Sequence, residues 1–148
     1  MSTQTQTIER TTLTNLIYNE DYTRKVLPFI KAEYFANRNE RVVFEEIEKF
    51  LDKYNSLPTK ETLTIGVDNR KDINDEEYKK IVAIISTLDK TDVDLQWLHD
   101  ETEKFCKDKA IYNAVLDGIK IIDGKDKERT PEAIPSILSD ALAVSFDL

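Results

Sequence analysis

The 148-residue chain is poor in glycine and in metal ligands, and both shortages limit its possible functions. Its three glycines, Gly66, Gly118 and Gly124, do not form the G-x-x-x-x-G-K-[ST] loop that holds nucleotide phosphates. His99 and Cys106 are the only histidine and cysteine, so the chain lacks the ligands of a structural zinc site and the pair needed for an intrachain disulfide. We therefore expect no catalytic, cofactor or metal site in this chain.

Long apolar runs and an excess of positive charge are also missing. No segment has the roughly 18 uninterrupted apolar residues of a membrane-spanning helix. Residues 1–10 lack the regions of a signal peptide and read as a polar tail, which favours a cytoplasmic protein. The formal net charge of −8 is opposite in sign to that of most domains that grip phosphates, so we expect weak or no direct DNA binding.

Helical apolar spacing runs through most of the chain and predicts an all-α fold. Within residues 1–90 we expect a globular bundle of about five short helices. They cover about residues 7–18, 22–30, 39–54, a short segment capped by Thr59, and a segment that begins at Asn74 with Glu77 as its capping-box partner. The third helix has Val43, Ile47, Phe50, Leu51 and Tyr54 on one side, which is expected to face the core. Residues 66–73 are expected to form a loop.

Residues 91–148 have a different pattern of apolar and polar residues, typical of an extended helical hairpin. One long helix is expected from Asp92 or Asp94 to about Asp123, a length of roughly 45 Å. Its middle, residues 102–109, is nearly all polar, whereas its later part is apolar. A helix with this pattern is expected to project from the bundle and to contact something else with its far end.

The expected turn of the hairpin has clear boundaries. Gly124 is a typical left-handed stop for the long helix. Thr130 and Pro131 match the N-cap and first position of a returning helix, unless Pro135 delays its start by one turn.

Three stretches of the sequence occur in an order that resembles one known family. They are LIYNEDYTRKVLPFIKAEYF followed by NERVVFEEI (16–35 and 39–47), WLHDETEKFCKDKAIYNA (97–114) and AIPSILSDALAVSFD (133–147). Their order and spacing resemble the N-terminal domain of DnaB-type hexameric replicative helicases, in particular those of T-even-type phages. The resemblance extends from about Leu13 to Asp147.

The resemblance implies a function that works by protein–protein contact in DNA replication. In this family the domain is an all-α collar whose protomers pair through their hairpins and form a ring, commonly a trimer of dimers. The ring lies on six ATPase domains, which use ATP and Mg²⁺, and it docks primase and in some systems a loader. By this resemblance the chain looks like the isolated N-terminal part of a helicase in a phage-infected bacterial host, with no ATPase or unwinding activity of its own.

The resemblance also implies where self-association occurs. The apolar residues toward the end of the expected hairpin match the place where the family dimerises, and they are Ile111, Tyr112, Val115, Ile119, Ile122, Ile137 and Leu142. The alternative is that these residues only hold the two helices of the hairpin together. Trp97 and Leu98 are expected to pack the root of the hairpin against the bundle.

Two other functional classes are compatible with the sequence. One is a stand-alone phage adaptor or regulator with this fold, and the coding sequence beyond Leu148 would distinguish it from part of a helicase. The other is a small hydrolase that uses surface carboxylates, which would require metal-dependent activity lost on mutation of an acid pair.

Overall fold

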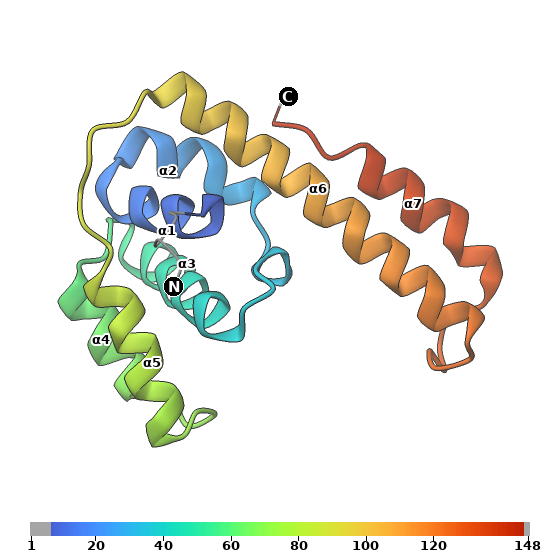
Figure 1. Ribbon diagram of the computed structural model, residues 1–148, viewed down its shortest axis with the longest axis horizontal. Helices are drawn as coiled ribbons and strands as arrows, with labels where there is room; N and C mark the ends of the chain where they lie inside the picture. The colour runs from blue at the N-terminus through green and yellow to red at the C-terminus, as the bar shows by residue number, and fades with distance from the viewer. Residues whose placement is uncertain (1–6, 147–148) are drawn as a thin grey trace, which may run out of the picture. The chain divides into compact units, whose positions relative to one another are not determined.

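The computed structural model describes residues 7–146, and within this range it is helical with no strand (Figure 1). The α-helices are α1 (Ile8–Tyr18), α2 (Glu20–Val26), α3 (Arg38–Tyr54), α4 (Lys60–Asp68), α5 (Asp75–Ser86), α6 (Leu95–Ile122) and α7 (Ile134–Leu142). Single 3-10 turns are η1 (Leu27–Phe29), η2 (Ala32–Tyr34) and η3 (Pro131–Ala133). The predicted all-α fold is confirmed. Of the predicted polar tail, residues 1–6 lie outside the described residues, Thr7 is the N-cap of α1, and residues 8–10 belong to α1.

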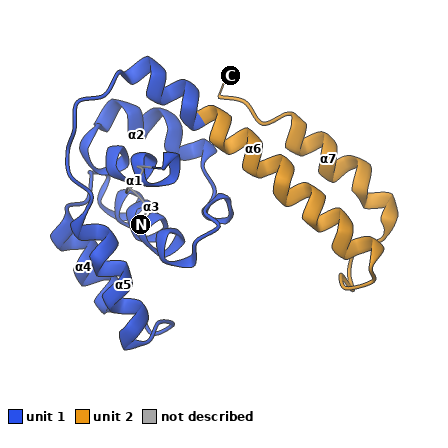
Figure 2. Cartoon of the chain, in the orientation of Figure 1, with its two compact units in different colours: residues 1–102 blue, residues 103–148 orange. Residues whose placement is uncertain are grey.

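The chain divides into two compact units, unit 1 (residues 1–102) and unit 2 (residues 103–148) (Figure 2). The sequence placed the division at residues 90 and 91 instead. The two divisions differ because the first two turns of α6, which begins at Leu95, belong to unit 1.

Helix α3 is the centre of unit 1. It contacts α1, α4, α5 and η2. Val43, Phe44 and Ile47 of this helix are fully buried, and the Phe44 ring stacks on the Phe35 ring with a centroid distance of 5.2 Å. Tyr34 is also buried, so the connector between η1 and α3 fills the core from one side of α3.

Side-chain caps set the start of α4 and α5. Thr59 forms a capping box with Thr62, and Asn74 forms the predicted one with Glu77. Helix α4 continues to Asp68, so the loop predicted at residues 66–73 is wrong in its first part. Gly66 marks a close approach of two helices instead of a helix end, because a Cβ atom there would collide with the Glu46 carboxylate of α3.

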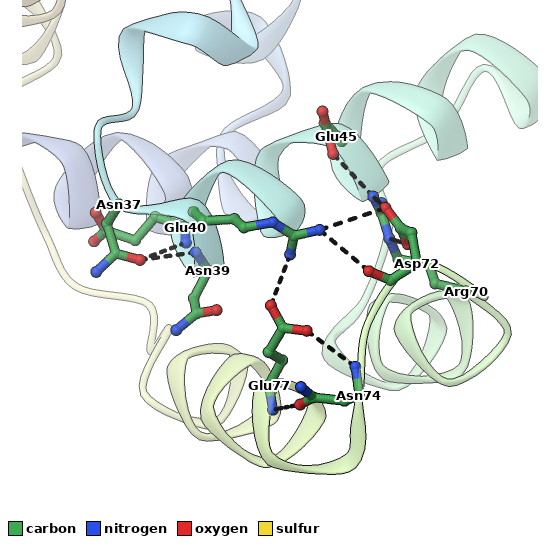
Figure 3. Close-up of polar contacts among 9 residues, drawn as sticks. Asn37, Asn39, Glu40, Glu45, Arg70, Asp72, Asn74 and Glu77 are labelled. Carbon is green, nitrogen blue, oxygen red and sulfur yellow. Dashed lines mark hydrogen bonds and ion pairs between the residues drawn. The ribbon is translucent and has the colours of Figure 1, made fainter.

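Two arginines fix the segment between α4 and α5 to α3. Arg70 donates to Glu46 at 2.9 Å. It also donates to Glu45 at 3.1 Å and to Asp72 at 2.9 Å (Figure 3). These hydrogen bonds, with Asp72 first, hold the Arg70 pKa above its ordinary value. Arg38 at the start of α3 donates to the Glu77 carboxylate at 3.2 Å and to the carbonyl of Asp72 at 3.2 Å.

In unit 2, α7 runs antiparallel to α6 as a helical hairpin (Figure 2). A Cβ atom at Gly118 of α6 would lie in van der Waals contact with Ile134 of α7. Nearer the C-terminus, the Glu103 carboxylate of α6 accepts the backbone N–H of Phe146 at 2.8 Å. Gly124 has a φ of 73°, which confirms the left-handed stop of α6.

Both predicted starts of the returning helix correspond to a helical element. Thr130 and Pro131 open η3, a single 3-10 turn, and the regular helix α7 begins one turn later at Ile134. At the start of α6, the Asp94 carboxylate accepts the Trp97 N–H at 2.8 Å, so Asp94 is the N-terminal cap that the sequence left open.

Candidate functional site

The most exposed apolar surface of unit 2 lies on one side of α6. Its six members are Ile111, Tyr112, Val115, Leu116, Ile119 and Ile122, each between 37% and 70% exposed. At 100° per residue they occupy an arc of about 140° around the helix. We call these six residues the α6 face. Lys104 and Asp108, paired at 2.9 Å, precede the face on the same helix, and Asp123 follows it.

A different side of α6 closes the hairpin. Ala114 and Ile121 are buried, and Gly118 lies beside Ile134 of α7. These residues are about 300°, 280° and 340° from Ile111 around the helix, outside the arc of the α6 face. The residues that hold the two helices together are therefore mostly small, and they are distinct from the α6 face.

The structure separates the residues that the sequence proposed for self-association. Ile111, Tyr112, Val115, Ile119 and Ile122 all belong to the α6 face, and each exposes between 37% and 70% of its surface. On α7, Leu142 is 71% exposed and Ile137 is half-buried. Leu116 was not among the predicted residues, although its position four residues after Tyr112 on a helix could have identified it. Self-association of this surface stays a prediction.

The two residues expected at the root of the hairpin have different environments. Both lie in the part of α6 that belongs to unit 1. Leu98 is fully buried there, whereas Trp97 is 51% exposed. Of the two, only Leu98 contributes to the core. His99, on the same helix, is mostly buried, with 20% of its side chain exposed.

The turn after the α6 face is closed by one carboxylate. Asp126 accepts the N–H groups of Glu128 at 2.9 Å and Arg129 at 3.1 Å, and it pairs with the Arg129 side chain at 2.8 Å. These bonds hold the pKa of Asp126 below its ordinary value, with the Glu128 N–H as the largest cause. Lys109 lies over the ring of Tyr112 at 5.6 Å, so a cation borders the α6 face.

The single cysteine of the chain is buried. Burial, and then the charge of Glu103, raise the pKa of the Cys106 thiol to about 12, which keeps it protonated at neutral pH. Among residues 7–146, no group of three or more histidine, cysteine, aspartate or glutamate side chains could hold a metal ion. No helix in the same range is long and apolar enough to cross a membrane.

Unit 1 also contains a groove that the sequence analysis missed. It lies between α3 and α4 and has a volume of about 320 Å³. Its lining residues are Glu46, Lys49, Phe50, Lys53 and Tyr54 of α3 with Thr62, Ile65, Gly66 and Asn69 of α4. The expectation that Tyr54 faces the core is wrong, because it is 57% exposed. Tyr54 is the last residue of α3, and helical periodicity does not reveal that no other helix covers it.

Comparison with known proteins identifies one relationship over most of the chain. No family model matches. The chain is 32% identical over 143 residues to the "DnaB-like replicative helicase" of Enterobacteria phage T4, an alignment that covers 91% of this chain. The chain spans only 30% of the length of that relative. The resemblance inferred from the sequence is therefore confirmed, and the chain is a helicase-related domain similar to the N-terminal domain of DnaB-type replicative helicases.

Proposed function

We propose that this chain is the assembly domain of a phage replicative DNA helicase, and that it self-associates through the α6 face. The sequence relationship supports the helicase context. The observation that carries the mode of action is the α6 face itself, where six large apolar side chains remain exposed on the outside of a two-helix hairpin.

The size of the α6 face suggests how strong this association is. Complete burial of a large aliphatic or aromatic side chain contributes about 1.5–3 kcal/mol. Because the six residues are already about half-buried, covering the rest of one face contributes roughly 5–9 kcal/mol. A dimer covers two such faces, which contribute roughly 9–18 kcal/mol in total. Association itself costs about 4–15 kcal/mol, so one pair of faces predicts a reversible, concentration-dependent dimer.

A second copy of the same face is the occupant that its chemistry fits best. The arc from Ile111 to Ile122 holds only apolar and aromatic side chains, and a like surface would leave no buried charge unpaired. A two-fold axis places identical patches against each other, as in most homodimers. Charged residues at both ends of the face, Asp108 and Asp123, would then lie at the rim.

The resemblance extends this proposal to the complete machine. Dimers of this domain would assemble into a ring, a hexamer of three such pairs, and would dock primase or a helicase loader. ATP and Mg²⁺ would act in a motor domain outside this chain. We place the activity in the cytoplasm of the infected host.

The test is the molar mass of the intact chain across a dilution series, measured by light scattering and sedimentation. We expect a concentration-dependent dimer for the unmodified chain and a shift to monomer for Ile119→Asp, because the new carboxylate would be buried at the contact. Leu95→Asp is the matched control, since Leu95 is also on α6 and 53% exposed but belongs to unit 1. It should associate like the unmodified chain.

Two results would reject the proposal. One is a monomer at every concentration up to about 1 mM, the range in which even weak complexes form. The other is an Ile119→Asp variant that keeps its helical circular dichroism and associates as strongly as the Leu95→Asp control.

A further inference from the structure

The groove between α3 and α4 is lined in part by apolar side chains that could bind a side chain of a partner. Phe50 and Tyr54 lie one turn apart on α3, and their ring centroids are 4.7 Å apart. Ile65 of α4 lines the same groove and is 61% exposed. Aromatic and aliphatic side chains around a concave surface of this size typically receive an apolar anchor.

The charge of the groove is opposite to that of the chain. Lys49 and Lys53, one helical turn apart, are both exposed and both line it. Glu46 is the one acid among the lining residues, and its buried carboxylate is paired with Arg70 at 2.9 Å. The groove therefore has two uncompensated positive charges in a chain whose formal net charge is −8.

The other acids of α3 do not cancel these lysines from within the groove. Around the helix, Glu45, Glu48 and Asp52 are about 100–160° from Glu46, whereas Lys49 and Lys53 are about 20–60° from it in the same direction. Glu45 is only about 40° from Lys49, but it pairs with Arg70 at 3.1 Å. None of the three acids lines the groove. The Lys53 ammonium lies 5.4 Å from the centre of the Tyr54 ring, so the cation and the apolar wall are adjacent.

We propose that this groove binds an acidic, amphipathic peptide segment of a partner protein. An apolar or aromatic side chain of the segment packs on Phe50, Tyr54 and Ile65, and its carboxylates pair with Lys49 and Lys53. This is helix-in-groove recognition, in which apolar anchors recur at helical spacing. The small volume makes the contact a weak and transient one.

A peptide fits these observations better than a single-stranded nucleic acid. A nucleic acid carries a phosphate on every nucleotide and needs a longer basic track than two lysines. The aliphatic side chain of Ile65 also offers no flat surface on which a base stacks.

The probe is a fluorescein-labelled helical peptide of about 16 residues, with leucine and phenylalanine at i, i+4 spacing and glutamate on the flanks. Fluorescence polarisation follows its titration with the intact chain. A second peptide has lysine in place of every glutamate, and a third has serine in place of the apolar residues. We expect saturable binding of the first peptide and at least tenfold weaker binding of the other two.

Two double variants separate a specific site from general charge attraction. Lys49→Glu with Lys53→Glu reverses the charges of the groove and should weaken binding at least tenfold. Lys79→Glu with Lys80→Glu changes the net charge equally on exposed positions of α5 and should bind within twofold of the unmodified chain. Ile65→Ser should weaken binding at least threefold through loss of apolar contact. Circular dichroism checks that each variant is folded.

Several results would overturn the proposal. They are no saturable binding of the acidic peptide at about 1 mM chain, equal binding of the lysine peptide, or an equal loss in both double variants. Tight binding of a single-stranded DNA oligonucleotide that is lost only in the Lys49→Glu, Lys53→Glu variant would assign the groove to nucleic acid. Loss of self-association in that variant would assign it to a second copy of the chain.

Discussion

The two units bury their apolar residues in different ways. Among the described residues, every large side chain that is completely buried lies in unit 1, including Phe35, Phe44 and Leu98. Unit 2 buries fewer and on average smaller residues: Phe105, Cys106, Ala114, Ile121, Ala141 and Phe146. Five of its large aliphatic side chains, with Tyr112, instead lie on the exposed α6 face.

This difference follows from the number of helices in each unit. In unit 1, α3 has neighbours on several sides, so most of its apolar residues, apart from Phe50 and Tyr54, are enclosed within the chain. A hairpin of two helices has one internal contact surface, and a helix with apolar residues on a second side leaves them exposed. Unit 2 therefore leaves a row of large apolar side chains exposed along one helix, whereas in unit 1 most of them are covered.

The largest expected effect comes from creating a cavity in the core of unit 1. Phe44→Ala should lower the free energy of unfolding by about 3–5 kcal/mol, because Phe44 is fully buried against Phe35. Ile122→Ala, on the α6 face, should change it by no more than about 0.5 kcal/mol in dilute, monomeric protein. Urea denaturation followed by circular dichroism measures both.

The comparison fails if the two variants behave alike under these conditions. A large loss in Ile122→Ala at a concentration where the chain is monomeric would mean that the α6 face is packed within the chain. At high concentration, association stabilises the folded unmodified chain. Because Ile122→Ala weakens the association, this variant should then have a slightly lower free energy of unfolding than the unmodified chain.

Most of the fold could be predicted from the sequence, because local signals set it. Thr59, Asn74 and Gly124 end or begin helices through their own side chains or backbone, and all three were identified. The length of α4 could not be predicted, since a glycine such as Gly66 usually indicates the end of a helix. Its actual role depends on Glu46, which is far away in the sequence.

The candidate surfaces could be predicted only in part. The resemblance pointed to the apolar residues of α6, but periodicity could not separate those that close the hairpin from those that face outward. The small residues Ala114 and Gly118 decide this, and they look unremarkable in a hydrophobic pattern. The groove was missed because Phe50 and Tyr54 continue the apolar stripe of α3, and only the packing of α4 determines how much of them is covered.

A smaller effect distinguishes the ion pairs of the two units. Arg70→Ala should cost about 2 kcal/mol, because the buried Glu46 carboxylate loses a charged hydrogen bond. Lys104→Ala in unit 2 should cost less than about 0.5 kcal/mol, since Lys104 and Asp108 are both exposed and water screens their attraction. Thermal unfolding followed by circular dichroism ranks the two variants.

A double variant checks the cause of the first loss. Glu46→Gln in the Arg70→Ala background removes the uncompensated charge and should restore part of the stability. If the two substitutions are simply additive, Arg70 acts through its other partners, Glu45 and Asp72, and not through Glu46.

The smallest effects concern two carboxylates whose pKa values are shifted in opposite directions. Burial first, then the charges of Asp52 and Glu45, raise the pKa of Glu48 in unit 1 above its ordinary value of 4.5. Its ionised form therefore costs stability, and this cost grows as the pH rises through the raised pKa. Glu48→Gln should stabilise unit 1 at pH 7 by no more than about 0.5 kcal/mol, since the carboxylate is only partly buried and solvent still screens it.

Asp126 in the unit 2 turn should show the reverse dependence. Because its pKa is below the ordinary value of 3.8, its contribution is complete above that value and is lost as the pH falls through the lowered pKa. Asp126→Asn should speed amide exchange at Glu128 and Arg129 at pH 7, but not in acid where the unmodified aspartate is protonated. The same substitution should leave exchange in α3 unchanged. Faster exchange in both units would show that the turn contributes to the stability of the whole chain, and the two units would then unfold together.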